Sequence, residues 1–241
     1  MADILIVKNL QKKFGSLVAV DDLSFDVSRG EILGMMGPNG AGKTTVFNLL
    51  TGLLKPDNGQ VIFGGHDITN ESPSKRCRQG IGRTHQIPRP FCKMTVFENL
   101  LVAAVYGGGL TEKQARGDIR DILEAIGLFQ SRNNLAGGLP LLDRKRLELG
   151  RALASRPNLV LLDEVAGGLT EAETDQVLEI VKNIQKRGVT IIWIEHVLET
   201  MTEGVDRLLV ISEGRWLKCG DPREVMRSKE VLESYMGVEE N

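Results

Sequence analysis

One loop of eight residues constrains this chain more than any other feature of its sequence. The loop consists of Gly37, Pro38, Asn39, Gly40, Ala41, Gly42, Lys43 and Thr44, and it matches the pattern G-x-x-x-x-G-K-[ST]. It follows an apolar run of buried-strand length at 32–36 and precedes helical spacing of apolar residues at 44–54. Backbone N–H groups in such a loop bind phosphate, helped by the positive end of the helix. We therefore expect Lys43 to bridge the β- and γ-phosphates of a nucleotide and the Thr44 hydroxyl to bind Mg²⁺.

Strand and helix patterns alternate along most of the chain. The predicted strands lie at 4–7, 17–20, 23–27, 32–36, 60–63, 159–162, 189–194, 208–211 and 215–219, and the predicted helices at 44–54, 171–187 and 197–202. Such alternation indicates an α/β fold whose mainly parallel sheet is covered by helices on both faces.

Residues at about 88–155 break this alternation and have a mostly helical pattern. Thr95 and Thr111 each begin a capping box, and a third helical segment spans 139–154. We expect a single domain over residues 1–237, with its core and β-subdomain at about 1–87 and 156–237 and a helical subdomain at about 88–155. Residues 238–241 are expected to form a frayed tail.

Composition excludes several classes of protein. Thirty Lys and Arg residues are balanced by 32 Asp and Glu, so the basic excess of a nucleic-acid binder is absent. Cys77, Cys92 and Cys219 are far apart, which argues against a metal site and favours small buried side chains. No apolar run approaches the ~20 residues of a membrane span. The first residues lack the basic segment of a signal peptide, so we expect a cytoplasmic protein.

Three further residues follow predicted strands and suit phosphate chemistry. Asp163 and Glu164 end the apolar run at 159–162, where Asp163 suits the outer shell of Mg²⁺ and Glu164 suits a general base. His196 follows the apolar run at 191–194 and suits contact with a γ-phosphate. Acidic residues and histidines at strand ends also occur for structural reasons. Asp163, Glu164 and His196 therefore indicate a catalytic site only in combination with the phosphate loop.

Gln86 and Phe14 are two more candidates. The Gln86 amide, just before the helical segment, could contact Mg²⁺ and the attacking water, although a solvated loop glutamine is the simpler interpretation. Phe14 lies well before the phosphate loop and could stack on adenine, with core packing as the alternative.

This set and order of motifs resembles the ATP-binding subunit of ATP-binding cassette (ABC) transporters over essentially the whole chain. The resemblance implies a P-loop core with a mainly parallel sheet, an N-terminal antiparallel β-subdomain and a helical insertion. It implies ATP and Mg²⁺ as ligands, and it adds Val20 and Thr45 to the nucleotide-binding residues. Lys43, Gln86, Glu164 and His196 are the expected catalytic residues, and Thr44, Gln86 and Asp163 the expected metal ligands. Asp163 and His196 are also expected to contact the nucleotide.

Four runs, at 14–20, 67–69, 80–86 and 94–103, resemble the ATPases of branched-chain amino acid importers. ATPases that serve urea or amide import or lipopolysaccharide export are close in pattern. The resemblance implies permease subunits, a second ABC ATPase and, indirectly, an extracytoplasmic solute-binding protein as partners, with the chain held at the inner face of the membrane. A soluble cassette ATPase of DNA repair or translation is disfavoured by the single cassette and the neutral charge. A nucleotide-gated scaffold with little hydrolysis is a third hypothesis.

The sequence departs from this family at its signature, usually LSGGQ. The register of 146–153 places Leu139–Asp143 at the signature, whereas the alternative, Leu135–Leu139, looks closer to LSGGQ but lies four residues earlier. Val165 replaces a usual proline, and residues 167–170 differ from the usual partner-facing loop. A poor signature favours a heterodimer with a second ATPase, although a homodimer is possible.

We also expect Gln86 and the segment 87–101 to meet the permease. The alternative is that its apolar residues Val96, Phe97, Leu100 and Leu101 pack inside the helical subdomain.

Overall fold

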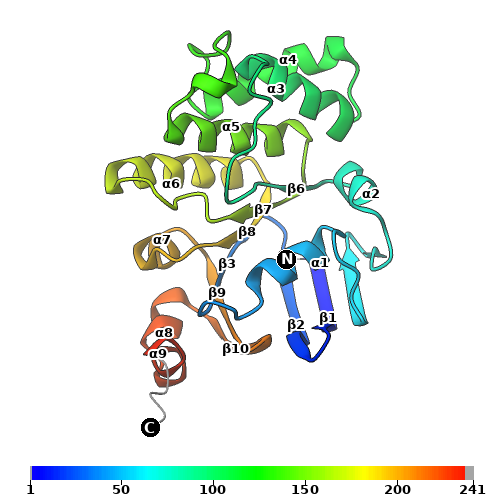
Figure 1. Ribbon diagram of the computed structural model, residues 1–241, viewed down its shortest axis with the longest axis vertical. Coiled ribbons are helices and arrows are strands. Elements are labelled where there is room, and N and C mark those ends of the chain that lie inside the picture. Colours follow the sequence, from blue (N-terminus) through cyan, green and yellow to red (C-terminus); the bar gives the residue numbers. More distant parts are fainter. Residues whose placement is uncertain (1, 237–241) are drawn as a thin grey trace. The chain divides into compact units, whose positions relative to one another are not determined.

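A computed structural model describes residues 2–236 of the chain (Figure 1). The predicted frayed tail at 238–241 lies outside the described residues. The chain divides into two compact units. The first unit comprises Met1–Pro73 and Thr190–Asn241, and the second comprises Ser74–Val189. The proposed boundaries of the helical subdomain stay a prediction.

An antiparallel sheet opens the first unit. It consists of β1 (Asp3–Phe14), β2 (Leu17–Ser28), β4 (Asn58–Phe63) and β5 (His66–Asp67), in the order β2-β1-β4-β5. The expected antiparallel β-subdomain is thereby confirmed, and the two predicted strands at 17–20 and 23–27 form one long strand. Leu5, Val7 and Leu10 of β1 are fully buried, and an irregularity in the register between Val7 and Leu10 interrupts the alternation of side chains.

The remaining strands of the first unit are mainly parallel. They are β3 (Ile32–Met36), β8 (Thr190–Ile194), β9 (Arg207–Ser212) and β10 (Arg215–Gly220). β3 pairs in parallel with β8 and β9, and β10 returns antiparallel along β9. Every residue of β3 and β8 is buried, as expected for strands covered on both faces.

Four helices complete the first unit: α1 (Lys43–Leu50), α7 (Leu198–Glu203), α8 (Pro222–Arg227) and α9 (Lys229–Met236). The predicted helix at 44–54 is wrong at its C-terminal end. α1 ends at Leu50, and Gly52 follows with φ +77°, a left-handed conformation that ends a helix and that glycine adopts without strain.

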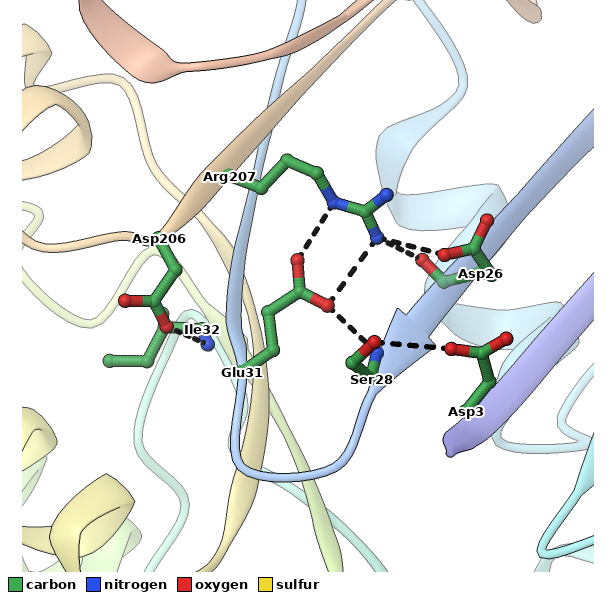
Figure 2. Close-up of polar contacts among 7 residues, drawn as sticks. All are labelled: Asp3, Asp26, Ser28, Glu31, Ile32, Asp206 and Arg207. Atoms are coloured by element: carbon green, nitrogen blue, oxygen red, sulfur yellow. Dashed lines mark hydrogen bonds and ion pairs between the residues drawn. The ribbon is translucent and has the colours of Figure 1, made fainter. Parts of the chain in front are cut away.

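A polar cluster around Arg207 links the strands of the first unit (Figure 2). The Arg207 guanidinium at the start of β9 lies 2.8 Å from Glu31 and donates a 2.6 Å hydrogen bond to the Asp26 carbonyl in β2. Glu31 also accepts a 2.7 Å bond from the backbone N–H of Ser28. One guanidinium therefore joins the end of β2, the turn before β3 and the first residue of β9.

The second unit contains two parallel strands and most of the helices. The strands are β6 (Ile81–Arg83) and β7 (Leu159–Asp163). The helices are α2 (Pro73–Arg78), α3 (Val96–Val102), α4 (Glu112–Ala125), α5 (Leu141–Ala154) and α6 (Glu171–Lys186), with a π-helical turn at Ala103–Gly107 and a 3₁₀ turn at Ala136–Gly138. The predicted capping boxes at Thr95 and Thr111 are confirmed, and a third begins α6 at Thr170.

Two expectations from composition can be compared with the structure. Cys92 is exposed, so the expectation of a buried cysteine is wrong there; it lies in the loop before α3. Within residues 2–236, no helix is long and apolar enough to cross a membrane.

Candidate nucleotide-binding and catalytic site

The phosphate loop of the first unit connects β3 to α1. Gly42 is the N-cap of α1, so the backbone N–H groups of the first helical turn face the loop. The Lys43 ammonium donates hydrogen bonds to the carbonyls of Gly37 at 2.7 Å and Pro38 at 3.0 Å. Lys43 is only 7% exposed, and its two hydrogen bonds join the end of the loop to its beginning. The loop thus curls around the Lys43 ammonium, whose charge suits a nearby phosphate.

Two glycines of this loop have no room for a side chain. A Cβ atom on Gly37 would lie 2.1 Å from the Ile211 carbonyl oxygen, and one on Gly42 would lie 2.3 Å from that of Ala19. Gly42 also has φ +101°, which other residues rarely adopt. The loop is therefore packed directly against the backbone of β2 and β9.

The other predicted residues of the loop differ in exposure. Asn39, Gly40 and Thr44 are exposed, and Thr45 is partly exposed. Ala41 is buried, and its carbonyl accepts a 3.0 Å hydrogen bond from the backbone N–H of Gly214. The exposed rim of the loop is thus free to approach a ligand while its base is held by the protein.

Phe14 and Val20 lie in the antiparallel sheet of the first unit, in different surroundings. Phe14 ends β1 with 46% of its surface exposed, and the Lys12 ammonium lies 5.7 Å from the centre of its ring. This exposure rules out core packing for Phe14, and its stacking on adenine stays a prediction. Val20 is fully buried, and its contact with nucleotide stays a prediction.

His196 is the second residue after β8, and it is exposed. Its backbone N–H donates a 3.3 Å hydrogen bond to Glu195, whose carboxylate also accepts one of 3.3 Å from the Trp193 indole. Glu195 and Trp193 are almost completely buried. The backbone before His196 is therefore anchored in the core, while the imidazole projects from it.

In the second unit, Asp163 ends β7 beside a cation. Its carboxylate lies 2.9 Å from the Arg83 guanidinium, and both side chains are nearly buried. The Thr84 hydroxyl accepts a 3.1 Å hydrogen bond from the Asp163 backbone N–H. Sequence reasoning missed Arg83, although it lies in the run at 80–86 that carries part of the family resemblance.

Glu164 is the next residue, and its side chain contacts Gln86. The Gln86 amide donates a hydrogen bond to the Glu164 carboxylate, so the structure brings these two predicted catalytic residues together. Glu164 has φ +48°, a left-handed conformation that is uncommon outside glycine and that recurs at functional sites. Its carbonyl accepts a 2.9 Å hydrogen bond from the Lys145 ammonium. Lys145, in α5, was also missed, because no sequence pattern links α5 to this turn.

One possible signature segment, Leu135–Leu139, precedes α5, and the other, Leu139–Asp143, includes its first residues. Residues 136–138 form the 3₁₀ turn, and the Arg144 guanidinium bonds the carbonyls of Gly137 at 3.0 Å and Leu139 at 2.7 Å. Pro140 is the N-cap of α5, and a proline has no side-chain group with which to cap it. Leu141, the first helical residue, is 45% exposed.

The segment expected to meet the permease is partly exposed. Ile87 and Phe91 are 68% and 45% exposed. Val96 and Leu100 are fully buried in the second unit, so for these two the alternative of internal packing holds. The buried face of α3 is therefore not available to a partner, and contact of the segment 87–101 with a permease stays a prediction.

Fold and site together define a P-loop ATPase of the cassette type. Residues 20–167 match the ABC transporter family. The chain is 35% identical to the high-affinity branched-chain amino acid transport ATP-binding protein LivG of Salmonella typhimurium, over 97% of this chain and 98% of the relative. It is 32% identical to the lipopolysaccharide export system ATP-binding protein LptB of Haemophilus influenzae, over 97% of each.

Solved structures agree with this assignment. The ADP conformation of MJ1267, an ATP-binding cassette of an ABC transporter, superimposes with a TM-score of 0.92 at 32% identity, covering 98% of this chain and all of that one. The chain belongs to the ABC transporter family, as an ATP-binding subunit whose ATPase activity is coupled to transport.

Proposed function

We propose that this chain drives an importer of branched-chain amino acids or related small amino acids and amides. One observation carries the proposal: 35% identity to LivG extends over nearly the full length of both chains. Similarity to LptB at 32% identity supports lipopolysaccharide export as the second candidate. In either system the chain would be held at the inner face of the membrane by permease subunits, and in an importer a solute-binding protein would deliver the solute.

The proposed chemistry divides between binding and hydrolysis. The curled loop around Lys43 binds the phosphates, and the exposed ring of Phe14 stacks on adenine. Glu164 accepts a proton from the water that attacks the γ-phosphate, with Gln86 holding the carboxylate toward that water. His196 contacts the γ-phosphate. The products are ADP and inorganic phosphate.

Magnesium fits the residues predicted to hold it. Thr44, Gln86 and Asp163 offer only oxygen ligands from hydroxyl, amide and carboxylate groups, which Mg²⁺ prefers. Thr44 is exposed in the first turn of α1, and a single carboxylate suffices because Mg²⁺ at such sites keeps water and phosphate ligands. Magnesium would neutralise charge on the phosphates, and Arg83 keeps the Asp163 carboxylate in place for it.

The functional unit is proposed to be a dimer with a second ABC ATPase. Support comes from the start of α5, where Pro140 and the exposed Leu141 occupy the favoured signature register. A signature built this way offers few hydrogen-bond donors to a nucleotide on the opposite subunit, so a partner with an ordinary signature is favoured over a second copy.

Reconstitution tests the choice of solute. The tagged chain is purified from its own cells with the permease and ATPase that accompany it. The complex is placed in vesicles, with ATP on the side of the ATPase and the solute-binding protein on the opposite side. We expect ATP-dependent uptake of labelled leucine, with no uptake in the Glu164→Gln complex. ATP-dependent extraction of lipopolysaccharide from the vesicles, with no amino acid or amide uptake, would establish the second candidate instead.

A further inference from the structure

One face of α5 carries three charged residues, of which two are almost completely buried. Lys145, Glu148 and Arg151 are spaced three residues apart, so they share a face of the helix. Lys145 and Glu148 are each only 4% exposed. Charged side chains are rarely buried to this extent unless they make specific polar contacts. We therefore expect Lys145 and Glu148 to make specific polar contacts inside the second unit.

Lys145 contacts the turn that carries Glu164. The Glu164 carbonyl accepts a 2.9 Å hydrogen bond from the Lys145 ammonium and a 3.2 Å bond from the backbone N–H of Gly167. A Cβ atom on Gly167 would lie 3.9 Å from the same ammonium. The cation thus lies at a tight turn whose first residue, Glu164, has the unfavourable left-handed conformation.

Arg151 contacts the loop that carries Gln86. Its guanidinium donates a 2.9 Å hydrogen bond to the Arg89 carbonyl and lies 2.8 Å from the Glu148 carboxylate. It also lies 5.3 Å from the centre of the Phe91 ring. Glu148 therefore fixes Arg151, and Arg151 fixes the loop three residues beyond Gln86.

We propose that the face of α5 formed by Lys145, Glu148 and Arg151 positions the loops of Glu164 and Gln86 relative to each other. The Gln86 amide contacts the Glu164 carboxylate where the two loops meet, and α5 contacts the backbone of each loop through Lys145 and Arg151. Lys145, Glu148 and Arg151 are positioning residues. They act through the backbone of the two loops and do not contact the phosphates. The proposal rests on the proposed catalytic role of Glu164.

The test compares Lys145→Met, Lys145→Arg and Arg151→Met in the full chain, with Lys113→Met as the control at an exposed lysine of α4. Amide exchange, equilibrium ATP binding and single-turnover phosphate release are measured for each. In Lys145→Met we expect exchange at 164–168 to rise about fivefold, the effect of losing one hydrogen bond. Single-turnover hydrolysis should fall about tenfold or more, because small displacements of a catalytic group are costly. ATP affinity should stay within about twofold.

Two comparisons separate positioning from a general loss of structure. Lys145→Arg keeps the cation and should retain most of the rate, and Arg151→Met should raise exchange at 86–92 while leaving 164–168 unchanged. If Lys145→Met does not fold, Lys145→Gln, which is neutral and shorter, serves in its place. The proposal would be overturned if Lys145→Met changed neither amide exchange nor hydrolysis. It would also be overturned if Lys113→Met lowered the rate of hydrolysis as much as Lys145→Met does.

Glu164→Gln, measured beside Lys145→Met, distinguishes the positioning role of Lys145 from the catalytic role of Glu164. Normal hydrolysis by Glu164→Gln would remove Glu164 from the mechanism, and the exchange at 164–168 would still decide whether Lys145 holds the turn. Loss of hydrolysis in Glu164→Gln combined with normal exchange and turnover in Lys145→Met would retain the catalytic role and reject the positioning role.

Discussion

The carboxylate of Asp163 lies 2.9 Å from the guanidinium of Arg83, although 79 residues separate them in the chain between β6 and β7. The exposed fractions of the two side chains are 7% and 11%. Because little water reaches the pair, each charge depends on the other. Removing one member leaves the other buried without its counter-charge.

We therefore expect Arg83→Met to lower the free energy of unfolding by about 3 kcal/mol. The physical cause is the isolated Asp163 carboxylate at the end of β7. Urea unfolding followed by circular dichroism measures the change. Arg116→Met is a matched control, because its ion pair with Glu112 is exposed and should contribute little. If Arg83→Met lowered the free energy of unfolding no more than Arg116→Met does, the buried pair would not be important for stability.

Lys43→Ala and Glu164→Gln should separate binding from hydrolysis. Lys43→Ala removes the cation around which the loop is curled, so ATP binding and hydrolysis should both be lost. Glu164→Gln keeps the shape of the side chain but loses the base, so ATP should still bind while phosphate release nearly stops. Binding of labelled ATP and phosphate release measure the two effects. Normal ATP affinity in Lys43→Ala would show that the loop is not the nucleotide site.

Phe14→Ala should weaken nucleotide affinity by about 1 kcal/mol or more, because the exposed ring would no longer stack on adenine. Stability should change little, since the ring is outside the core. Titration calorimetry with ATP gives the affinity, and Leu17→Ala, another exposed residue near the same turn, is the control. The same dissociation constant in both variants would exclude a role for Phe14 in binding.

Local patterns predicted most of these features, and contacts distant in sequence were harder to foresee. The phosphate loop and the capping boxes at Thr95 and Thr111 lie within a few residues of sequence, so their side chains and spacing suffice. The helix predicted at 44–54 failed because apolar spacing continued past Gly52, where the backbone turns left-handed. Arg83 and Lys145 escaped notice because their partners are brought to them only by folding.

The stability of the chain should depend on pH through His85. Partial burial disfavours the charged imidazolium, although part of the side chain is exposed, and the nearby Arg83 and Arg151 add repulsion. The pKa of His85 is therefore lowered despite the carboxylates of Glu148 and Asp163. The folded chain then binds this proton more weakly than the unfolded chain does. The contribution of His85 is therefore fully present above its ordinary pKa of about 6.5 and is lost as the pH falls below it.

His85→Gln should remove that part of the pH dependence. We expect the wild-type chain to lose more stability than the variant between pH 7.5 and 5.5, in urea unfolding at both pH values. Nuclear magnetic resonance of the imidazole should also place its titration below about 6.5. A His85 titration above that value would contradict the argument.

The start of α5 is poorly suited to complete the nucleotide site of an opposite subunit. In the expected composite site, each phosphate loop is completed by the signature of the opposite subunit, whose glycines allow close backbone approach to the phosphate. Here Pro140 has neither hydroxyl nor N–H, and the Leu141 side chain projects where a glycine would leave space. Asp143 adds a negative charge in the first turn, although Arg146 lies 3.4 Å away and offsets part of it. The chain should therefore be a poor signature donor.

Homodimers of the chain should hydrolyse ATP slowly, because both of their sites would use this signature. Replacing residues 140–143 with Ser-Gly-Gly-Gln should raise homodimer turnover, since the serine supplies a hydroxyl and the glycines free the backbone. The same replacement should also cap α5, so unfolding measurements are needed to separate added stability from added activity. Introducing Ser-Gly-Gly-Gln at 136–139 instead tests the alternative register. Brisk wild-type turnover that does not rise with the change at 140–143 would reject the poor-signature argument, and a rise only with the change at 136–139 would assign the signature to Leu135–Leu139.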